Sequence, residues 1–257
     1  MSAKSVGFVG AGRVAGIFLG GWSRGDRMPE KVVVFDANPE VSEKLRAAHP
    51  GLQVGNLSEA AAQDVVFLAV HPPVIGEVVP LLAPHLRPGA VLVSLAPKFT
   101  VGRLSAMLGG FARIARVIPN AASAVGKGYN PAAFGEALSE QDCCGVCSLL
   151  EPLGECVEVP EAQLETYAVV TAMGLTFMWP QLEMLVSLAE SAGLSRDAAL
   201  VGVGKMLVGA VATMRDSGLP PAGVMDLVPV RPLAEEVGAF VGVARPKLEG
   251  LLAKLHP

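Results

Sequence analysis

The chain has 257 residues, of which 51% are hydrophobic and 17% charged, and its formal net charge is −4. This composition supplies a hydrophobic core, and without a basic cluster it excludes nucleic acid as a partner. Glycines and prolines interrupt the apolar runs, so we expect neither a signal peptide nor a membrane-spanning segment, and we predict a soluble, cytoplasmic protein with no membrane partner.

Short β-branched runs alternate with helical patterns up to about residue 120. Continuous apolar strands between helices are typical of a parallel sheet that is covered on both faces. The fold class predicted is therefore α/β, a Rossmann-like doubly wound parallel sheet. The predicted strands are Ser5–Gly10, Lys31–Asp36, Asp64–Val70, Ala90–Leu95 and Ala112–Val117. The predicted helices are Arg13–Arg24, Pro39–Ala48, Ser58–Ala62, Val74–His85 and Val101–Leu108.

The chain changes character after the alternating part. Residues 122–135 are rich in Gly, Ala and Asn and predict a loop, which a helix at Ser139–Leu150 and a short strand at Glu155–Val159 follow. From Glu161 onward the pattern is helical, with a break at 217–223. We therefore predict a dinucleotide-binding domain over 1–160 and an all-helical domain over 161–257. So small and apolar a domain favours burial against a second copy, which predicts a homodimer, or a higher oligomer built from it.

A glycine turn of the form GxGxxA follows the first predicted strand, with Gly10, Gly12 and Ala15 at its three positions. The first glycine permits a tight turn, and the second lets backbone amides approach a pyrophosphate at a helix N-terminus. Its place between a strand and a helix predicts dinucleotide binding. The alternative is a turn that only allows close packing.

Asp36 ends the second predicted strand, where an acidic residue accepts a hydrogen bond from a ribose 2′-hydroxyl. Asn38 and Pro39 already supply a cap for the next helix, which leaves Asp36 free for the ribose. A carboxylate there repels a 2′-phosphate, so NAD is favoured over NADP. Arg13 is placed to reach a pyrophosphate or a 2′-phosphate, which leaves NADP open.

Cys143, Cys144 and Cys147 lie together in a predicted helix, and Cys156 follows nine residues later. A thiolate metal site usually has two separated CxxC pairs, so we predict reduced, partly buried cysteines and no metal.

Several segments together resemble the pyrroline-5-carboxylate reductase family over nearly the whole chain. The glycine turn is similar to its GxGxMA, with Val14 in place of Met. The other matching segments are residues 55–59, similar to DN-x-E; 65–73, similar to LAVKPQ; 116–128, similar to R-x-MPNTPA-x-VG-x-G; 164–177, similar to LDAVTALSGSGPAY; and 225–228, similar to DMV.

The resemblance implies a set of coenzyme-binding residues and a set of substrate-binding residues. His71 stands where the family has a coenzyme-side lysine, which favours a positioning role over an acid role. The resemblance names no catalytic residue. The residues implied for the coenzyme are Gly10, Gly12, Arg13, Val14, Asp36, Asn56, Val70, His71, Pro72, Ala96, Pro97 and Asn120, and those for the substrate are Asn120, Thr171, Met173 and Arg231.

Departures from the family fall in the substrate half. The family's small, hydroxyl-rich pocket becomes Met173, Leu175, Phe177 and Val230, and Arg231 is the candidate partner for a substrate carboxylate. The alternative for Arg231 is a solvated arginine at a helix start.

The resemblance implies an NAD(P)H-dependent reductase that transfers hydride from nicotinamide C4 to the C=N bond of a small imine acid in proline biosynthesis. Two alternatives stay open: the same scaffold reducing a different imine or keto substrate, and a non-catalytic NAD(P)-binding sensor.

Overall fold

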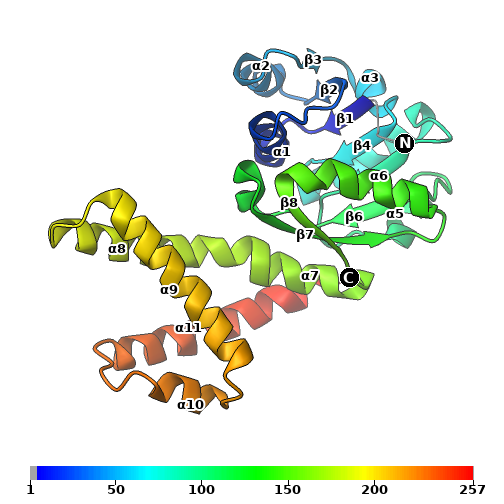
Figure 1. Ribbon diagram of the computed structural model, residues 1–257. Coiled ribbons are helices and arrows are strands. Elements are labelled where there is room, and N and C mark those ends of the chain that lie inside the picture. Colours follow the sequence, from blue (N-terminus) through cyan, green and yellow to red (C-terminus); the bar gives the residue numbers. More distant parts are fainter. Residues whose placement is uncertain (1–4, 257) are drawn as a thin grey trace. The chain divides into compact units, whose positions relative to one another are not determined.

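The computed structural model describes residues 5–256, and within them one eight-stranded sheet has the order β3-β2-β1-β4-β5-β6-β7-β8 (Figure 1). The strands β1 to β6 are parallel. This confirms the predicted Rossmann-like doubly wound sheet. The parallel strands are β1 (Ser5–Val9), β2 (Lys31–Phe35), β3 (Gln53–Val54), β4 (Val65–Leu68), β5 (Val91–Ser94) and β6 (Ile114–Val117).

Helices cover both faces of the sheet because side chains alternate along each strand. Phe8 and Phe67 point into the first core with Trp22, whereas Val9 and Leu68 point into the second. The first face carries α1 (Arg13–Arg24), α2 (Pro39–Ala48) and α6 (Glu140–Leu150). The second carries α3 (Leu57–Ala61), α4 (Ile75–Leu82) and α5 (Val101–Met107). Short 3₁₀ turns are η1 (Pro72–Val74), η2 (Ala83–His85), η3 (Ala121–Val125) and η4 (Glu151–Leu153).

One predicted loop is wrong, because strand β7 (Gly128–Phe134) occupies the second half of residues 122–135. It runs antiparallel to β6 and parallel to β8 (Gly154–Glu158), and it is largely buried. Its Pro131 cannot donate a ladder hydrogen bond, but the Pro131 carbonyl accepts one from Ile118 N at 2.9 Å. Gly, Asn and Pro mark turns by local preference, and here pairing on both sides overrides that preference.

Beyond β8 the described residues are helical, as predicted. The chain forms two compact units: residues up to Met173 together with those from Leu251, and Gly174–Gly250. This division differs from the predicted boundary near residue 160, so the limits of the folding domains stay a prediction. The elements are η5 (Glu161–Gln163), α7 (Leu164–Tyr167), the π-helical η6 (Ala168–Met173), α8 (Gly174–Ser191), α9 (Arg196–Asp216), α10 (Pro221–Asp226) and α11 (Ala234–Leu255).

Two helical stretches, 161–191 and 196–216, are long and apolar enough to cross a membrane by length and composition alone. The expectation that no segment meets this criterion is therefore wrong. Small and polar residues are interspersed among the apolar residues of both stretches, so neither stretch is a continuous apolar run. Many of their side chains are exposed in the single chain, for example Leu188 and Val208.

A buried ion-pair cluster holds the segment after β5. Arg116 on β6 is 1% exposed, and its guanidinium donates to Glu165 Oε1 at 2.5 Å and to Glu161 Oε1 at 3.0 Å. Glu165 Oε1 also accepts from the amide of Lys98 at 3.0 Å. Lys98 has a φ of +75°, which costs about 1–3 kcal/mol for a residue other than glycine. The cluster therefore fixes a strained segment that follows Ala96 and Pro97.

The same cluster sets the charge of Glu165. Burial by itself raises the pKa of this carboxyl, but hydrogen bonds from Arg116 and the Lys98 amide outweigh burial and leave the pKa below its ordinary value. A lowered pKa in the folded state means that ionised Glu165 stabilises the fold above the ordinary pKa, and that this stabilisation is lost as the pH falls through the lowered value.

We expect Glu165→Gln to destabilise the fold by about 3 kcal/mol, because it removes the fully buried partner of Arg116 and leaves the partly exposed Glu161 as the remaining carboxylate beside that buried charge. Urea unfolding at neutral pH measures this loss, and repeating it at falling pH should show a weaker acid dependence in the variant. Glu151→Gln is the matched control, since the Arg27–Glu151 pair is exposed and contributes less than about 1 kcal/mol. Equal effects of the two substitutions would contradict this account.

Candidate functional site

The carboxyl ends of the six parallel strands lie along one edge of the sheet, where ligands bind in open α/β folds. The strand order reverses between β1 and β4, which places the switch point beside the glycine turn. Every residue predicted for the coenzyme follows one of these strand ends or opens α1. The first of them after each strand are Gly10, Asp36, Asn56, Val70, Ala96 and Asn120.

Gly10 makes the turn from β1 into α1 at a φ of +102°. A Cβ added at this position would lie 2.6 Å from the carbonyl oxygen of Ala69 and 2.9 Å from the amide nitrogen of Val70. The backbone after β1 thus touches the backbone after β4, and only glycine fits there.

Gly12 is different, since a Cβ added there would have no atom within 4 Å. Gly12 is the N-cap of α1, no side chain caps that end, and the first turn carries no acidic residue. The first amides of a helix have no partner within the helix, and the helix dipole favours an anion beside them. The space in front of Gly12 therefore suits a pyrophosphate, with Arg13 and Val14 in the same turn.

Asp36 is not free, contrary to the sequence-based expectation. Its Oδ2 accepts the amide of Ala11 at 2.9 Å and its Oδ1 accepts the amide of Asn38 at 2.9 Å. Asn38 caps α2 as predicted, by accepting from Glu40 N at 3.0 Å. Each carboxylate oxygen has a second lone pair, so Asp36 keeps the capacity to accept from a ribose hydroxyl. The carboxylate also ties the glycine turn to the end of β2.

Asp36 and Asn56 line one hollow of about 430 Å³, together with Phe35, Pro39 and Gly55. Asn56 caps α3, because its Oδ1 accepts from Glu59 N at 2.9 Å while Glu59 Oε2 accepts from Asn56 N at 2.8 Å. This volume suits a nucleoside. The hollow brings together two predicted coenzyme residues that follow different strands, β2 and β3.

The other side of the switch point carries Val70, His71 and Pro72 after β4, and Ala96 and Pro97 after β5. His71 is exposed and precedes the short turn η1. Ala96 is buried, and its amide donates to Ser94 Oγ at 3.4 Å. Local sequence patterns do not identify Arg116 and Glu165, which hold this second segment; the available signal is a single arginine inside the apolar strand Ile114–Val117.

Asn120 and Thr171 belong to neighbouring parts of the first unit. Ile118, two residues before Asn120, lies in one apolar cluster with Ala168 and Ala172 of η6. The six residues of η6 include Thr171 and Met173 and form a π-helix, a conformation frequent at functional sites. The Thr171 hydroxyl donates to the Tyr167 carbonyl at 2.8 Å.

Arg231 lies in the second unit, between α10 and α11. Its guanidinium pairs with Asp226 and donates to the Val228 carbonyl at 3.4 Å, and its side chain is 46% exposed. An exposed guanidinium has five donors, so these contacts leave it able to bind a carboxylate.

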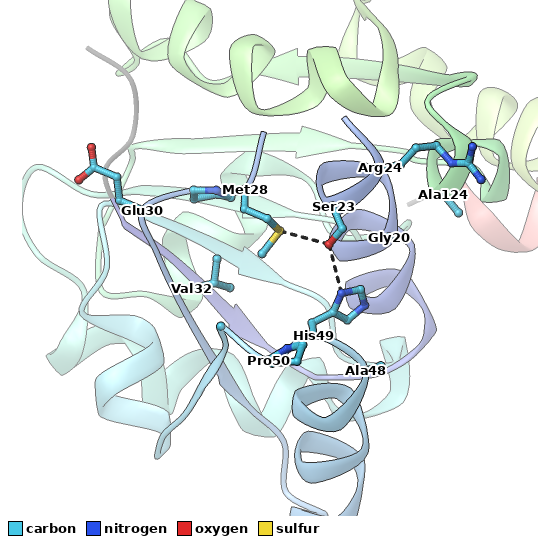
Figure 2. Close-up of a pocket in the computed structure, with 12 residues that line it drawn as sticks. Gly20, Ser23, Arg24, Met28, Glu30, Val32, Ala48, His49, Pro50 and Ala124 are labelled. Carbon is cyan, nitrogen blue, oxygen red and sulfur yellow. Dashed lines mark hydrogen bonds between the residues drawn. The ribbon is translucent and has the colours of Figure 1, made fainter. Parts of the chain in front are cut away.

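Figure 2 shows a second hollow, which involves the C-terminal ends of α1 and α2 and the start of β2. There Ser23 Oγ lies 3.3 Å from His49 Nδ1 and 3.7 Å from Met28 Sδ. Because α1 runs away from the glycine turn, this hollow is at the amino ends of the strands and outside the candidate site.

Comparisons with known proteins agree with this arrangement. Residues 5–98 match the family model described as NADP oxidoreductase coenzyme F420-dependent. The chain is 24% identical over 231 residues to pyrroline-5-carboxylate reductase of Methanosarcina acetivorans, covering 89% of this chain and 85% of the relative. It is 29% identical over 221 residues to pyrroline-5-carboxylate reductase 3 of Bos taurus, covering 85% and 71%.

A solved structure of Plasmodium falciparum pyrroline carboxylate reductase with NADP bound has the same fold. The TM-score is 0.79 at 20% identity, and the match covers 99% of this chain and 97% of that one.

Two glycine substitutions should separate binding from folding. Gly12→Ala keeps an allowed φ of −75° and meets open space, so we expect a stability change below about 1 kcal/mol. Its methyl group occupies the proposed pyrophosphate position, so coenzyme affinity should fall about tenfold or more. Gly10→Ala should instead destabilise the fold by about 3 kcal/mol, through its strained φ and the clash with Ala69.

Thermal unfolding and calorimetric titration with NADH and NADPH measure the two effects. Unchanged coenzyme affinity in a folded Gly12→Ala variant would remove the glycine turn from the site.

Proposed function

We propose that this chain, a divergent member of the pyrroline-5-carboxylate reductase family, is an NAD(P)H-dependent oxidoreductase that reduces the C=N bond of a small imine acid, as in proline biosynthesis. The observation that carries the proposal is the uncapped N-terminus of α1, which faces open space directly after the Gly10 turn at the switch point of the sheet.

The residues present fit a nicotinamide dinucleotide. The amides at Gly12, Arg13 and Val14 would hold its pyrophosphate, and Asp36 would accept a hydrogen bond from a ribose hydroxyl. Asn56 would border the nucleoside end in the hollow it shares with Asp36. The bound coenzyme would supply hydride from nicotinamide C4.

The nicotinamide end would lie among the segments that follow β4, β5 and β6. Val70, His71 and Pro72 would border it on one side, with Ala96 and Pro97 on the other. The cluster of Arg116 and Glu165 keeps the second of these segments in place. Fixing such segments reduces the motion of the reacting groups and helps to exclude water.

The substrate carbon would accept the hydride and its nitrogen a proton, so that the C=N bond becomes a CH–NH bond. Asn120 would orient the nicotinamide or the substrate, and Thr171 and Met173 would border the substrate. Arg231 would bind a substrate carboxylate, either in place of Asp226 or beside it. We assign no residue as the proton donor; a solvent molecule or a hydroxyl group would supply the proton.

A second candidate function is reduction of a different imine or of a keto acid on the same scaffold. It is favoured by Met173, Leu175, Phe177 and Val230, which stand where the family has small and hydroxyl-bearing residues. Larger apolar side chains change which substrates fit, and fold similarity does not fix the substrate.

We further propose that the second unit forms a homodimer, and that the enzyme acts in the cytoplasm. The unit exposes many apolar side chains, with Val208 71% and Val230 76% exposed. Apolar surface of this kind gains free energy when a second copy covers it. Burial against a second copy would also explain why the helices in 161–191 and 196–216 are apolar enough to satisfy the membrane-span criterion.

Steady-state oxidation of NADH and NADPH with a panel of cyclic imine acids and keto acids tests the function. We expect turnover with an imine acid, and a higher kcat/KM with NADH because Asp36 repels a 2′-phosphate. Turnover with keto acids alone would favour the second candidate. Tight coenzyme binding without any turnover would contradict an enzyme and favour a sensor.

Sedimentation velocity without detergent tests the homodimer. We expect a dimer for the natural chain, and for Val208→Glu a dissociation constant about a hundredfold higher, because a carboxylate would be buried between the copies. Leu81→Glu is the matched control on α4, where the side chain is 57% exposed, and it should leave the dimer intact. A monomeric natural chain would contradict the dimer, as would co-sedimentation only with lipid vesicles.

A further inference from the structure

Two cysteines that the candidate site does not use lie in contact. Cys147 on α6 and Cys156 on β8 have their Sγ atoms 3.0 Å apart. A disulfide bond has an S–S length of about 2.0 Å, so closing this pair needs a movement of about 1 Å. We expect rotation of the two cysteine side chains to supply a movement of this size.

The helix that carries Cys147 packs into the core, and the strand that carries Cys156, β8, pairs with β7. Val146, Leu149 and Leu150 of α6 are buried in the first core cluster, and Leu153 of the connecting turn is buried with them. Trp22 Nε1 of α1 also donates to the Leu149 carbonyl at 2.7 Å. The contact between Cys147 and Cys156 is therefore kept by the surrounding packing.

We propose that Cys147 and Cys156 form a redox modification site. A small disulfide compound oxidises the two thiols reversibly to an intramolecular disulfide, which links α6 to the edge strand β8. The two thiols lose two protons and two electrons in total. The oxidising disulfide gains them and becomes two thiols, so the exchange balances.

The order of steps follows from the surroundings of each thiol. Burial raises the pKa of Cys156, and the neighbouring Cys147 thiol and Glu158 raise it further. Cys147 therefore attacks the small disulfide first and releases one thiol, forming a mixed disulfide. Cys156 then loses its proton to solvent and attacks Cys147 Sγ, and the second thiol leaves.

Cys143 and Cys144 are less suited to this bond. The close Sγ–Sγ contact is between Cys147 and Cys156, whereas Cys144 is exposed and Cys143 is only partly buried. Among residues 5–256, no group of His, Cys, Asp and Glu side chains is arranged to hold a metal ion, so the cluster offers thiol chemistry.

The test treats the full-length protein with bis(2-hydroxyethyl) disulfide, a neutral reagent, blocks the remaining thiols and digests the chain after glutamate without reduction. Glu155 separates the two cysteines, so a bond between them joins two peptides in the mass spectrum. We expect a Cys147–Cys156 link that is about 2 Da lighter than the two reduced peptides together and that a reducing agent reverses. The midpoint of thermal unfolding should rise by about 5 °C.

Variants sharpen the outcome. Cys144→Ser is the control and should still form the link, whereas Cys156→Ser should retain the mixed disulfide at Cys147. If Cys156→Ser does not fold, Cys147→Ala and the natural chain decide the question. Reaction of Cys144 shows that the reagent has acted on the natural chain. If Cys147 and Cys156 are then found as free thiols carrying the blocking group, the proposal is overturned, as it is by a link from either of them to another cysteine.

Discussion

The contact between the backbone of Gly10 and the backbone of Ala69 and Val70 is the constraint on which the candidate site depends. It brings the ends of β1 and β4 together at the point where the strand order reverses. Glycine at position 10 has no side chain to clash with Ala69, and its positive φ turns the chain directly into α1. The first amides of that helix then face open space at Gly12. The same turn joins β1 to α1 and leaves a place for an anion.

Charged side chains fix the backbone segments on both sides of this site through hydrogen bonds. Asp36 joins the glycine turn to the start of α2, and it lines a hollow together with Asn56. On the other side Arg116 and Glu165 fix a segment with a positive φ at Lys98. Each of these groups keeps a segment near the strand ends in position, which is the requirement for orienting a coenzyme.

The family likeness covers nearly the whole chain, but its departures concentrate where a substrate would bind. The glycine turn resembles the family's pattern, whereas Met173, Leu175 and Val230 stand at positions where the resemblance implies a small, hydroxyl-rich pocket. The π-helical conformation of η6 places Thr171 and Met173 on an unusual backbone beside the end of β6. A scaffold that retains its coenzyme half can change substrate through such side chains alone.

The sequence by itself determined the parallel sheet, the glycine turn and the residues at the strand ends, because these depend on short-range patterns of apolar side chains and glycines. It did not reveal β7. The Gly, Asn and Pro residues of this segment predict a loop, but pairing with β6 and β8 makes it a strand. Nor did it reveal that Asp36 already accepts two amides, or that Arg116 meets Glu165 across 49 positions of sequence. Contacts of that range exist only once the chain has folded, so the tertiary structure alone decided them.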